Sequence, residues 1–206
     1  RDFCLSRGLG DVYKRQLKSS ACSGAVFCLD ATANTALPGA ATSRAGLYLR
    51  YSALRAIGAT DQHVTCFRGT AETARSAQVQ MHNRWNPELN VQAVPGYTQL
   101  LRASDGRLAE RCLWTGRIAL PDTWESVTLL CVPMLDSAGN VRGICGAELS
   151  DLYFRLTYPA VDSAYGSMVT VLAPIDGDRL LLGQAMIGSP GLSLIHISEP
   201  TRQAEN

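Results

Sequence analysis

The sequence predicts an α+β fold, in which an antiparallel sheet is flanked by helices. Several short apolar segments are typical of strands, and two pairs of them are joined by a tight turn, as in hairpins. Helical segments interrupt these strands, and hairpin-joined strands with separate helices are typical of α+β domains. A chain of 206 residues can bury a core of its own without a metal or a disulfide.

The composition excludes several classes of protein. The formal net charge is +1, 46% of the residues are hydrophobic and 18% are charged, so the chain is neither disordered nor a polybasic nucleic-acid binder. It contains no run of about eighteen consecutive apolar residues, so no transmembrane helix is predicted within it. We therefore expect a soluble globular fragment.

Both ends carry sequence that is foreign to the domain. Residues 11–16 can be encoded by DNA whose reverse complement encodes residues 192–197, a relationship that has no explanation at the protein level. Translated sequencing-library adapters would produce such a pair, so residues 1–16 and 192–206 are interpreted as artefacts. The remaining residues, 17–191, are predicted to form one domain, with a second small lobe as the alternative.

The first part of this domain is predicted to consist mainly of strands. Residues 25–33 read as a short buried strand and residues 46–52 as an aromatic strand. Residues 63–68 carry apolar side chains at every second position, which is the period of a half-buried strand.

One helix is predicted to follow these strands. Thr70 is suited to cap a helix that runs to about Trp85, and Asn86-Pro87 would end it. Residues 88–110 are expected to be irregular or weakly helical, with a turn at Asp105-Gly106.

The clearest hairpin pattern lies between residues 126 and 149. Two apolar segments, 126–135 and 141–149, flank the sequence Asp-Ser-Ala-Gly-Asn. The three central residues suit a type I turn followed by a left-handed residue, and Gly139 can adopt that conformation at no steric cost.

This turn predicts the register of the hairpin. Leu135 would face Val141 and, further along, Cys131 would face Cys145 at a non-hydrogen-bonded pair. Two cysteines at such a pair are close enough for a disulfide, although buried free thiols are the commoner arrangement.

The last part of the domain is predicted to hold a helix and a second hairpin. Residues 151–164 would form a short helix broken at Pro159. The second hairpin would join residues 168–173 to residues 179–182, with its turn at Asp176-Gly177-Asp178.

The first of these hairpins has a distinctive order of residues. A strand ends in Val132-Pro133, a short turn holds an aspartate and a glycine, and the next strand carries Gly143-x-x-Gly146 and then Glu148 before a helix. This order resembles the central hairpin of Cache domains, the PAS-like extracytoplasmic sensors of bacterial membrane receptors. The resemblance covers about residues 113–183.

The resemblance implies a sensor of small molecules on the extracytoplasmic side of the cell membrane, within a bacterial signal-transduction protein. The membrane helix and the cytoplasmic output domain would lie outside residues 17–191. Closure around the ligand would shift the packing of the domain against a flanking helix. Neither an enzyme activity nor a cofactor nor a nucleic-acid contact is implied, and a homodimer is left open.

Glu148 is the first candidate for a ligand contact. In the predicted register it faces Thr128 on an otherwise apolar face, where a carboxylate must be paired, hydrogen-bonded or solvated. The matching position in the family is commonly an acidic ligand contact, which implies an amine-bearing ligand. The alternative is an internal ion pair with an arginine such as Arg50 or Arg117.

The segment before the central strand supplies the other candidates. Trp114 and Trp124 lie on either side of a stretch that contains Arg117 and Asp122, and aromatic faces bind cations. An aromatic and acidic segment at this place forms the lip of the pocket in the family. The predicted ligand-binding residues are therefore Glu148, Thr128, Trp114, Asp122, Trp124 and Arg117.

Three other functions stay open. A cytoplasmic PAS or GAF module would share the mixed helix–sheet layout and need no membrane span. A small cysteine-dependent hydrolase would need a cysteine beside His63 or His82, and a purely structural or dimerising domain would lack a concave pocket. The chain has no Cys-x-x-Cys spacing and no phosphate-binding glycine loop, so neither a metal site nor a nucleotide site is predicted.

Overall fold

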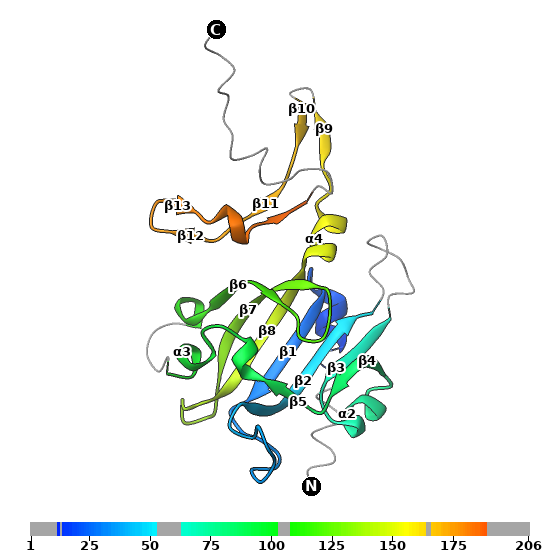
Figure 1. Cartoon of the computed structure of the whole chain (residues 1–206), viewed down its shortest axis with the longest axis vertical. Coiled ribbons are helices and arrows are strands. Elements are labelled where there is room, and N and C mark those ends of the chain that lie inside the picture. Colours follow the sequence, from blue (N-terminus) through cyan, green and yellow to red (C-terminus); the bar gives the residue numbers. More distant parts are fainter. Residues whose placement is uncertain (1–11, 13, 53–62, 103–107, 164–165, 189–206) are drawn as a thin grey trace.

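An eight-stranded sheet and a few short helices make up the body of the computed structural model, which is a mixed α+β fold as the sequence predicts (Figure 1). The predicted turn at Asp105-Gly106 lies outside the described part of the chain. The structure describes residues 12, 14–52, 63–102, 108–163 and 166–188.

Seven strands of the sheet follow one another in the order β4-β3-β2-β1-β8-β7-β6, and β5 pairs with the start of β2. All pairings in this sheet are antiparallel except that of β3 with β4. The hairpin of β1 and β2 therefore lies beside β8, the last strand of the β6-β7-β8 run. The strands are β1 (Gly24–Leu29), β2 (Ser43–Tyr51), β3 (Val64–Arg68), β4 (Gln80–Asn86), β5 (Glu88–Asn90), β6 (Leu113–Ala119), β7 (Ser126–Leu135) and β8 (Val141–Ser150).

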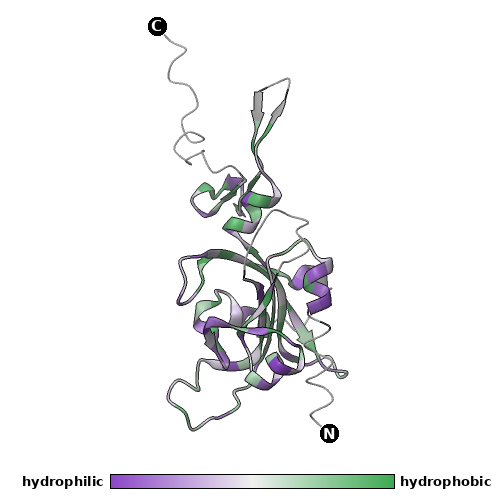
Figure 2. Ribbon diagram, turned by 90° about the vertical axis from the view of Figure 1, so that its right-hand side faces the viewer, coloured by the Kyte–Doolittle hydropathy of each residue, from purple (hydrophilic) through white to green (hydrophobic). Residues whose placement is uncertain are grey.

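Hydrophobic side chains cover both faces of this sheet. Because successive side chains of a strand point to opposite faces, β2 sends Leu47 and Leu49 into one cluster and Tyr48 into the other. The cluster around Leu49 packs against helix α2 (Ala71–Ser76) and residue Leu17. Figure 2 shows the hydrophobic residues along the central strands.

The opposite cluster, around Tyr48, is covered by shorter elements. These are the 3-10 turn η1 (Val91–Ala93) and helix α3 (Tyr97–Arg102), while η2 (Leu108–Arg111) leads into β6. Residues 88–110, expected to be irregular or weakly helical, therefore contain one short strand and short helical turns in their described part.

The helix predicted to run from Thr70 to about Trp85 is wrong in its second half. Thr70 caps α2 as expected, because its hydroxyl accepts a hydrogen bond from the Thr73 N–H at 3.1 Å. The helix ends at Ser76, however, and Gln80–Asn86 form β4, which pairs in parallel with β3. Pairing with a neighbouring strand outweighs the helix-favouring composition of this segment.

The turn between β7 and β8 is confirmed. The Asp136 N–H donates to the carbonyl oxygen of Asn140 at 2.9 Å, which closes a loop of three residues. Gly139 has a φ angle of 82°, in the left-handed region that favours glycine.

The register predicted from this turn is correct for one pair and then wrong. Leu135 faces Val141, but the next residue, Met134, faces Gly143. Arg142 is therefore an extra residue in β8, a β-bulge that shifts all later pairs by one. A one-residue shift moves each following side chain of β8 to the other face of the sheet.

This shift separates the two cysteines that the sequence placed opposite each other. Cys131 faces Gly146, while Cys145 faces Val132 on the other side of the sheet. Cys131 and Cys145 are both free thiols. The arrangement therefore corresponds to the alternative of free thiols, not to a cross-strand disulfide.

The segment after β8 begins as predicted and then departs from it. Helix α4 spans Asp151–Thr157, so it ends before Pro159 rather than continuing to residue 164. The following residues form a small hairpin of β9 (Val161–Ser163) and β10 (Gly166–Met168). In Figure 1 these strands extend away from the sheet beyond α4.

The second predicted hairpin turns at the expected place but has a different partner strand. Asp176 faces Arg179 across the turn between β12 (Ile175–Asp176) and β13 (Arg179–Leu180). The preceding strand β11 (Val171–Leu172) pairs with β14 (Met186–Ile187) instead of with residues 179–182. The 3-10 turn η3 (Leu182–Gln184) follows β13, and the strand that pairs with β11 begins only after this turn.

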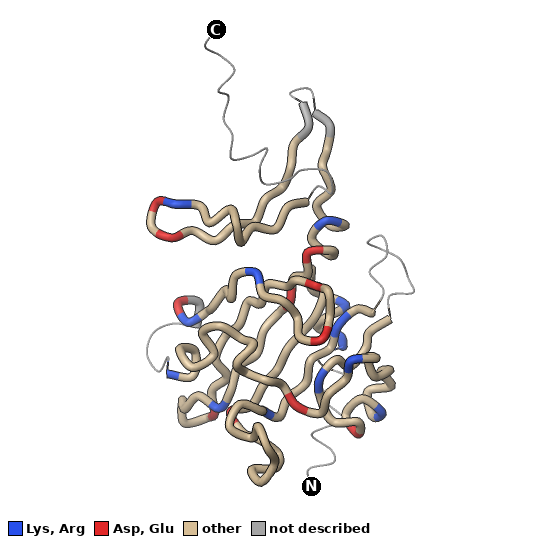
Figure 3. Tube along the Cα trace, viewed as in Figure 1, with Lys and Arg blue, Asp and Glu red and all other residues tan. Residues whose placement is uncertain are grey.

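Charged residues of both signs are distributed over the whole described chain, as Figure 3 shows.

Candidate ligand-binding site

Glu148 is fully buried in the sheet and forms an ion pair with Arg50. It faces Leu129 rather than Thr128, because the bulge at Arg142 turns it toward the cluster around Tyr48. The Nε of Arg50 donates to Oε2 of Glu148 at 2.6 Å, and Nη2 of Arg50 donates to Oε1 at 3.1 Å. Of the two alternatives for this carboxylate, the structure contains the internal ion pair with Arg50.

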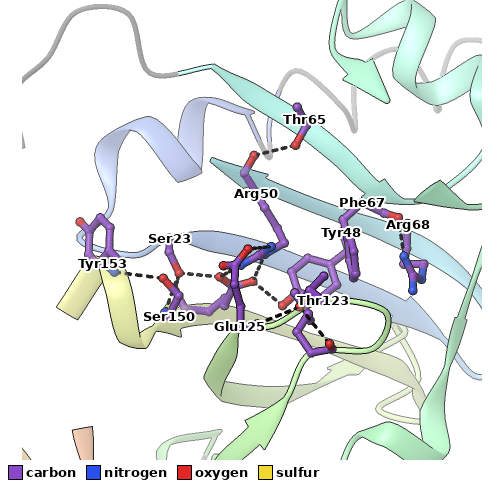
Figure 4. Close-up of polar contacts among 12 residues, drawn as sticks. Ser23, Tyr48, Arg50, Thr65, Phe67, Arg68, Thr123, Glu125, Ser150 and Tyr153 are labelled. Carbon is purple, nitrogen blue, oxygen red and sulfur yellow. Dashed lines mark hydrogen bonds and ion pairs between the residues drawn. The ribbon is translucent and has the colours of Figure 1, made fainter. Parts of the chain in front are cut away.

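The hydroxyl groups of Ser23 and Tyr48, both labelled in Figure 4, complete the environment of this carboxylate. Ser23 Oγ donates to Oε1 of Glu148 at 2.6 Å, and the Tyr48 hydroxyl donates to Oε2. A carboxylate has about four lone-pair sites, and four donors now occupy them. Glu148 therefore has no acceptor capacity left for a ligand in this conformation.

A second carboxylate holds the other end of the Arg50 guanidinium. Glu125 Oε2 accepts from Nη2 of Arg50 at 2.6 Å. Burial lowers the pKa of Arg50, but the attraction of Glu148 and Glu125 outweighs burial, so the pKa is raised above its usual value. Burial and the adjacent Glu148 charge raise the pKa of Tyr48 well above 10.0, so its phenol stays protonated as a donor.

The network continues from the ion pair to the start of α4. Ser23 Oγ accepts a hydrogen bond from the Ser150 N–H at 2.8 Å. The Ser150 side chain is in turn the N-cap of α4, accepting from the Tyr153 N–H at 3.1 Å. Side chains of β2 and β8, and that of Ser23 directly before β1, are thereby linked by hydrogen bonds to the first turn of the helix that leaves the sheet.

A pocket of about 700 Å³ lies beside this network, over the sheet face that carries Tyr48. Side chains of the strands form its floor: Tyr48 from β2, Phe67 from β3 and Leu129 from β7. Its walls are the loop between β1 and β2, the segment from β4 to η1 and the turn after β6. The lining residues are Thr32, Ala33, Asn34, Leu37, Pro38, Gly39, Ala40, Thr42, Ser43, Tyr48, Phe67, Arg68, Asn86, Pro87, Glu88, Leu89, Asn90, Ala93, Val94, Ile118, Leu120, Pro121, Asp122 and Leu129.

Arg68, the last residue of β3, is the buried charge of this pocket. It is 7% exposed, and its Nη1 donates to the carbonyl oxygens of Phe67 and Arg84 at 2.9 and 2.7 Å. Its guanidinium lies over the Phe67 ring, 3.9 Å from the centroid, within the range of a cation–π contact. Asp122 Oδ2 lies 3.4 Å from Nη2 of Arg68.

Glu88, on the opposite wall, holds the loop between β1 and β2. Its carboxylate accepts hydrogen bonds from the Ala33 N–H at 2.6 Å, from the Thr32 hydroxyl at 3.0 Å and from the Ser43 hydroxyl. Burial raises the pKa of Glu88, but these hydrogen bonds outweigh it, so the pKa lies below the usual 4.5. This carboxylate is ionised at neutral pH and already engaged.

Among the predicted ligand contacts, Asp122 lines this pocket. Leu129 lines its floor, so the adjacent Thr128 points to the opposite face of the sheet. Arg117 forms an ion pair with Asp151 at the start of α4 and does not reach Glu148.

The two tryptophans of the predicted lip lie away from the lining of the pocket. Trp114 on β6 is 46% exposed, and Trp124 is fully exposed in the turn that precedes β7. Neither belongs to the lining set of the pocket.

Arg68 and Phe67 were not predicted as site residues. Both lie at the end of the strand predicted over residues 63–68, where an arginine directly follows a buried aromatic residue. That placement is the one local signal, because the rest of the pocket comes from segments far apart in the chain.

Three buried thiols, those of Cys28, Cys66 and Cys131, lack the lowered pKa of a catalytic cysteine. Burial raises the pKa of Cys28 to about 12, that of Cys66 to about 11 and that of Cys131 to about 12. A nucleophilic cysteine needs a lowered pKa, because the thiolate is the reactive species. His82 packs against Phe67 with its ring centroid 5.2 Å away, and burial lowers its pKa.

The described part of the chain contains no group of three or more His, Cys, Asp or Glu side chains placed to hold a metal ion. Within the same residues, no helix combines the length and apolar character that crossing a membrane requires. Comparison of the chain with protein-family models, with curated proteins and with solved structures gave no match.

Proposed function

We propose that this chain is the small-molecule sensing domain of a Cache-type, PAS-like receptor. The pocket of about 700 Å³ over the sheet is the observation that carries the proposal. Its volume lies in the range of sites for small ligands, and its floor is apolar and aromatic with a few polar groups, as such sites usually are. The antiparallel run β2-β1-β8-β7-β6, with helical turns over one face, agrees with the expected PAS-like layout.

The contacts of Tyr48 supply a physical route from this pocket to the rest of the domain. Its ring lines the pocket, and its hydroxyl donates to Glu148, which is bonded through Ser23 to Ser150 at the cap of α4. A ligand that changes the position of Tyr48 would therefore act on the same network that fixes the start of α4. In a sensor, ligand binding would act through this network to change how α4 packs against the sheet.

The proposal includes a place in the cell. The domain would face the extracytoplasmic side, with a membrane helix and an output domain in the parent protein. Determining the coding sequence on both sides of residues 17–191 tests this part, because an apolar stretch of about twenty residues would be needed on at least one side.

A cytoplasmic PAS or GAF module is the second candidate function. Five free thiols among the described residues favour it, since free thiols are usual in a reducing compartment: Cys22, Cys28, Cys66, Cys131 and Cys145. Flanking sequence without any apolar stretch of that length would select this alternative over an extracytoplasmic sensor.

The expectation of an amine-bearing ligand depended on an available Glu148. Because four donors enclose that carboxylate, the basis for expecting an amine-bearing ligand is removed. Among the predicted ligand contacts, Asp122 lines the pocket.

Binding can be tested on the chain by thermal-shift measurements with a collection of metabolites. Ala93 lines the pocket, so Ala93→Trp is expected to fill it and abolish the shift given by any metabolite that binds. Ala138 lies in the exposed turn between β7 and β8, and Ala138→Trp is the matched control that should keep the shift. Equal shifts in both variants would place the ligand outside the pocket and contradict the proposal.

A further inference from the structure

Two buried arginines lie on neighbouring strands of the sheet, and their charges are balanced very differently. Arg50 on β2 has carboxylate oxygens of Glu148 and Glu125 at 2.6 Å. Arg68 on β3 has the carboxylate of Asp122 at 3.4 Å, and the Asp122 side chain is 67% exposed. Water therefore screens the one acid beside Arg68, whereas the Glu148 that faces Arg50 is fully buried.

The other contacts of Arg68 do not supply the missing negative charge. Its two strong acceptors are the carbonyl oxygens of Phe67 and Arg84, which are neutral dipoles. Burial is the largest influence on the pKa of Arg68 and lowers it, while the pKa of Arg50 is raised. Arg68 is thus a buried cation with incomplete compensation, and a buried charge of this kind favours an opposite charge nearby.

The two acidic residues of the pocket, Glu88 and Asp122, have less need of a cationic ligand than Arg68 has of an anionic one. Glu88 already accepts hydrogen bonds from Thr32, Ala33 and Ser43. Asp122 is largely solvated and has Arg68 beside it. Among the described residues that line the pocket, Arg68 is the charged side chain that gains most from a partner of opposite sign.

We propose that the ligand carries a carboxylate that binds the Arg68 guanidinium, while its apolar part lies on the floor formed by Tyr48, Phe67 and Leu129. The proposal rests on the proposed function, since it names the chemical class of ligand for the same pocket. The planar guanidinium matches a carboxylate in a two-point contact, and its stacking on Phe67 holds it in one orientation.

A carboxylate fits the charge of the pocket better than a phosphate. The described lining contains one guanidinium, that of Arg68, and two carboxyl groups, of which Glu88 is already engaged by three donors and Asp122 is 67% exposed. A carboxylate carries one negative charge, which one guanidinium can balance. A phosphate carries nearly two negative charges at neutral pH, and the described lining of the pocket has no second cation to balance the additional charge. Phosphate sites commonly combine several donors or a helix N-terminus for that reason.

The proposal can be tested with three series of compounds that share their carbon skeletons. The carboxylates from butanoate to octanoate and phenylacetate form the first series, the corresponding primary amines the second, and the primary amides the third. Thermal shifts followed by isothermal titration of the wild-type chain would measure binding. Members of the carboxylate series are expected to bind, and their amine and amide counterparts to bind at least ten-fold more weakly.

Substitution of Arg68 tests the anchor itself. Arg68→Met keeps the length and removes the charge, and it should weaken carboxylate binding by about 10- to 100-fold, the usual loss for a hydrogen-bonded charge pair. Arg142→Met is the matched control, because Arg142 lies in the bulge of β8 beside Asp136 and does not line the pocket. The control should leave carboxylate affinity unchanged.

Asp122→Asn tests the proposal without removing a buried side chain. Asp122 has a φ angle of 61°, which asparagine tolerates well, so this variant should fold even if Arg68→Met does not. Loss of the competing negative charge is expected to tighten carboxylate binding several-fold. An amine ligand held by Asp122 would instead bind more weakly in the same variant.

The outcomes separate the two levels of the proposal. Binding by amines or amides alone, or weaker carboxylate binding in Asp122→Asn, would overturn the carboxylate assignment and leave a sensing pocket in place. Failure of all three series and of the metabolite collection to shift the melting temperature would contradict the sensing function itself.

Discussion

Gly24 and Glu148 face each other across β1 and β8 with no room for a side chain between them. A Cβ atom on Gly24 would lie 2.9 Å from Oε2 of Glu148 and 3.0 Å from the Leu49 carbonyl oxygen. The glycine is required here by close approach, because the bidentate contact of Arg50 with Glu148 occupies the space beside it.

Gly24→Ala is therefore expected to destabilise the fold. Overpacking of a filled core costs about 1–3 kcal/mol, and the added methyl group would push against the Glu148 carboxylate. Urea unfolding followed by circular dichroism measures the change. Gly183→Ala is the matched control with nothing within 4 Å of the new Cβ, and it should change the free energy of unfolding by less than about 0.5 kcal/mol.

Glu148→Gln is expected to be far more destabilising than Glu125→Gln. Glu148 is fully buried, and loss of one partner from a buried ion pair costs about 3–5 kcal/mol. Glu125 is 40% exposed, so water compensates part of its loss, and the cost should be about 1 kcal/mol or less. If both variants lost the same free energy of unfolding in urea, the buried ion pair of Glu148 would not be what holds the strands together.

Tyr48 and Ser23 should act as a coupled pair, because both donate to the Glu148 carboxylate. A double-mutant cycle of Tyr48→Phe and Ser23→Ala is expected to give a coupling free energy of about 0.5–3 kcal/mol. Tyr51→Phe is the control tyrosine, since its hydroxyl donates to the Leu17 carbonyl oxygen instead. Additive effects in the first cycle would argue against a connected network.

Ser150→Ala should loosen the start of α4 specifically. Ser150 caps this helix, and loss of an N-cap costs about 1 kcal/mol. Hydrogen exchange of the α4 amides is expected to accelerate in this variant. Thr70→Ala removes the equivalent cap of α2 and should accelerate exchange in α2 while leaving α4 as it is; the same exchange pattern in both variants would contradict a local role for Ser150.

Glu88 gives the stability of the domain a defined dependence on pH. Its folded-state pKa lies below the usual 4.5 because the hydrogen bonds from Ser43, Ala33 and Thr32 outweigh burial. The unfolded state therefore takes up the proton first as the pH falls. The contribution of Glu88 is complete above about pH 5 and is lost as the pH falls below 4.5 through the folded-state pKa.

Glu88→Gln removes this titration. Its stability should decline less steeply than that of the wild type between pH 5 and about pH 3 in urea unfolding. Glu72→Gln, at an exposed glutamate of α2, is the control and should follow the wild-type curve. If the free energy of unfolding declined equally steeply with falling pH in the wild type and in Glu88→Gln, the role assigned to these hydrogen bonds would be contradicted.

Local chemistry allowed the turns to be predicted. The loop at Asp136–Asn140 depends on Gly139 and on hydrogen bonds within five residues, and the cap at Thr70 depends on one N–H three residues away. Both follow from short-range sequence, and both were confirmed. The end of the helix after Thr70 was missed because Gln80–Asn86 gain more from pairing with β3 than from continuing α2.

Long-range geometry limited the prediction of the site. The bulge at Arg142 has no marker in the sequence, and without it Glu148 was assigned to the wrong face of the sheet. Arg50 was named as one alternative partner of Glu148, but the sequence could not choose between them. The meeting of Arg68 with Asp122 depends on the path of β3 and of the turn after β6, which no local pattern encodes.

The extra residue at Arg142 also determines how the chain would respond to a lost codon. Arg142 is exposed, and replacing its side chain would disturb little. Deleting the residue would remove the bulge and leave every pair from Met134–Gly143 onward as it is, so Glu148 would still face Leu129. Arg50 would keep Glu148 as its partner, so an in-frame deletion at this surface position should be tolerated far better than deletion of a single residue within 144–147, which would turn Glu148 to the other face.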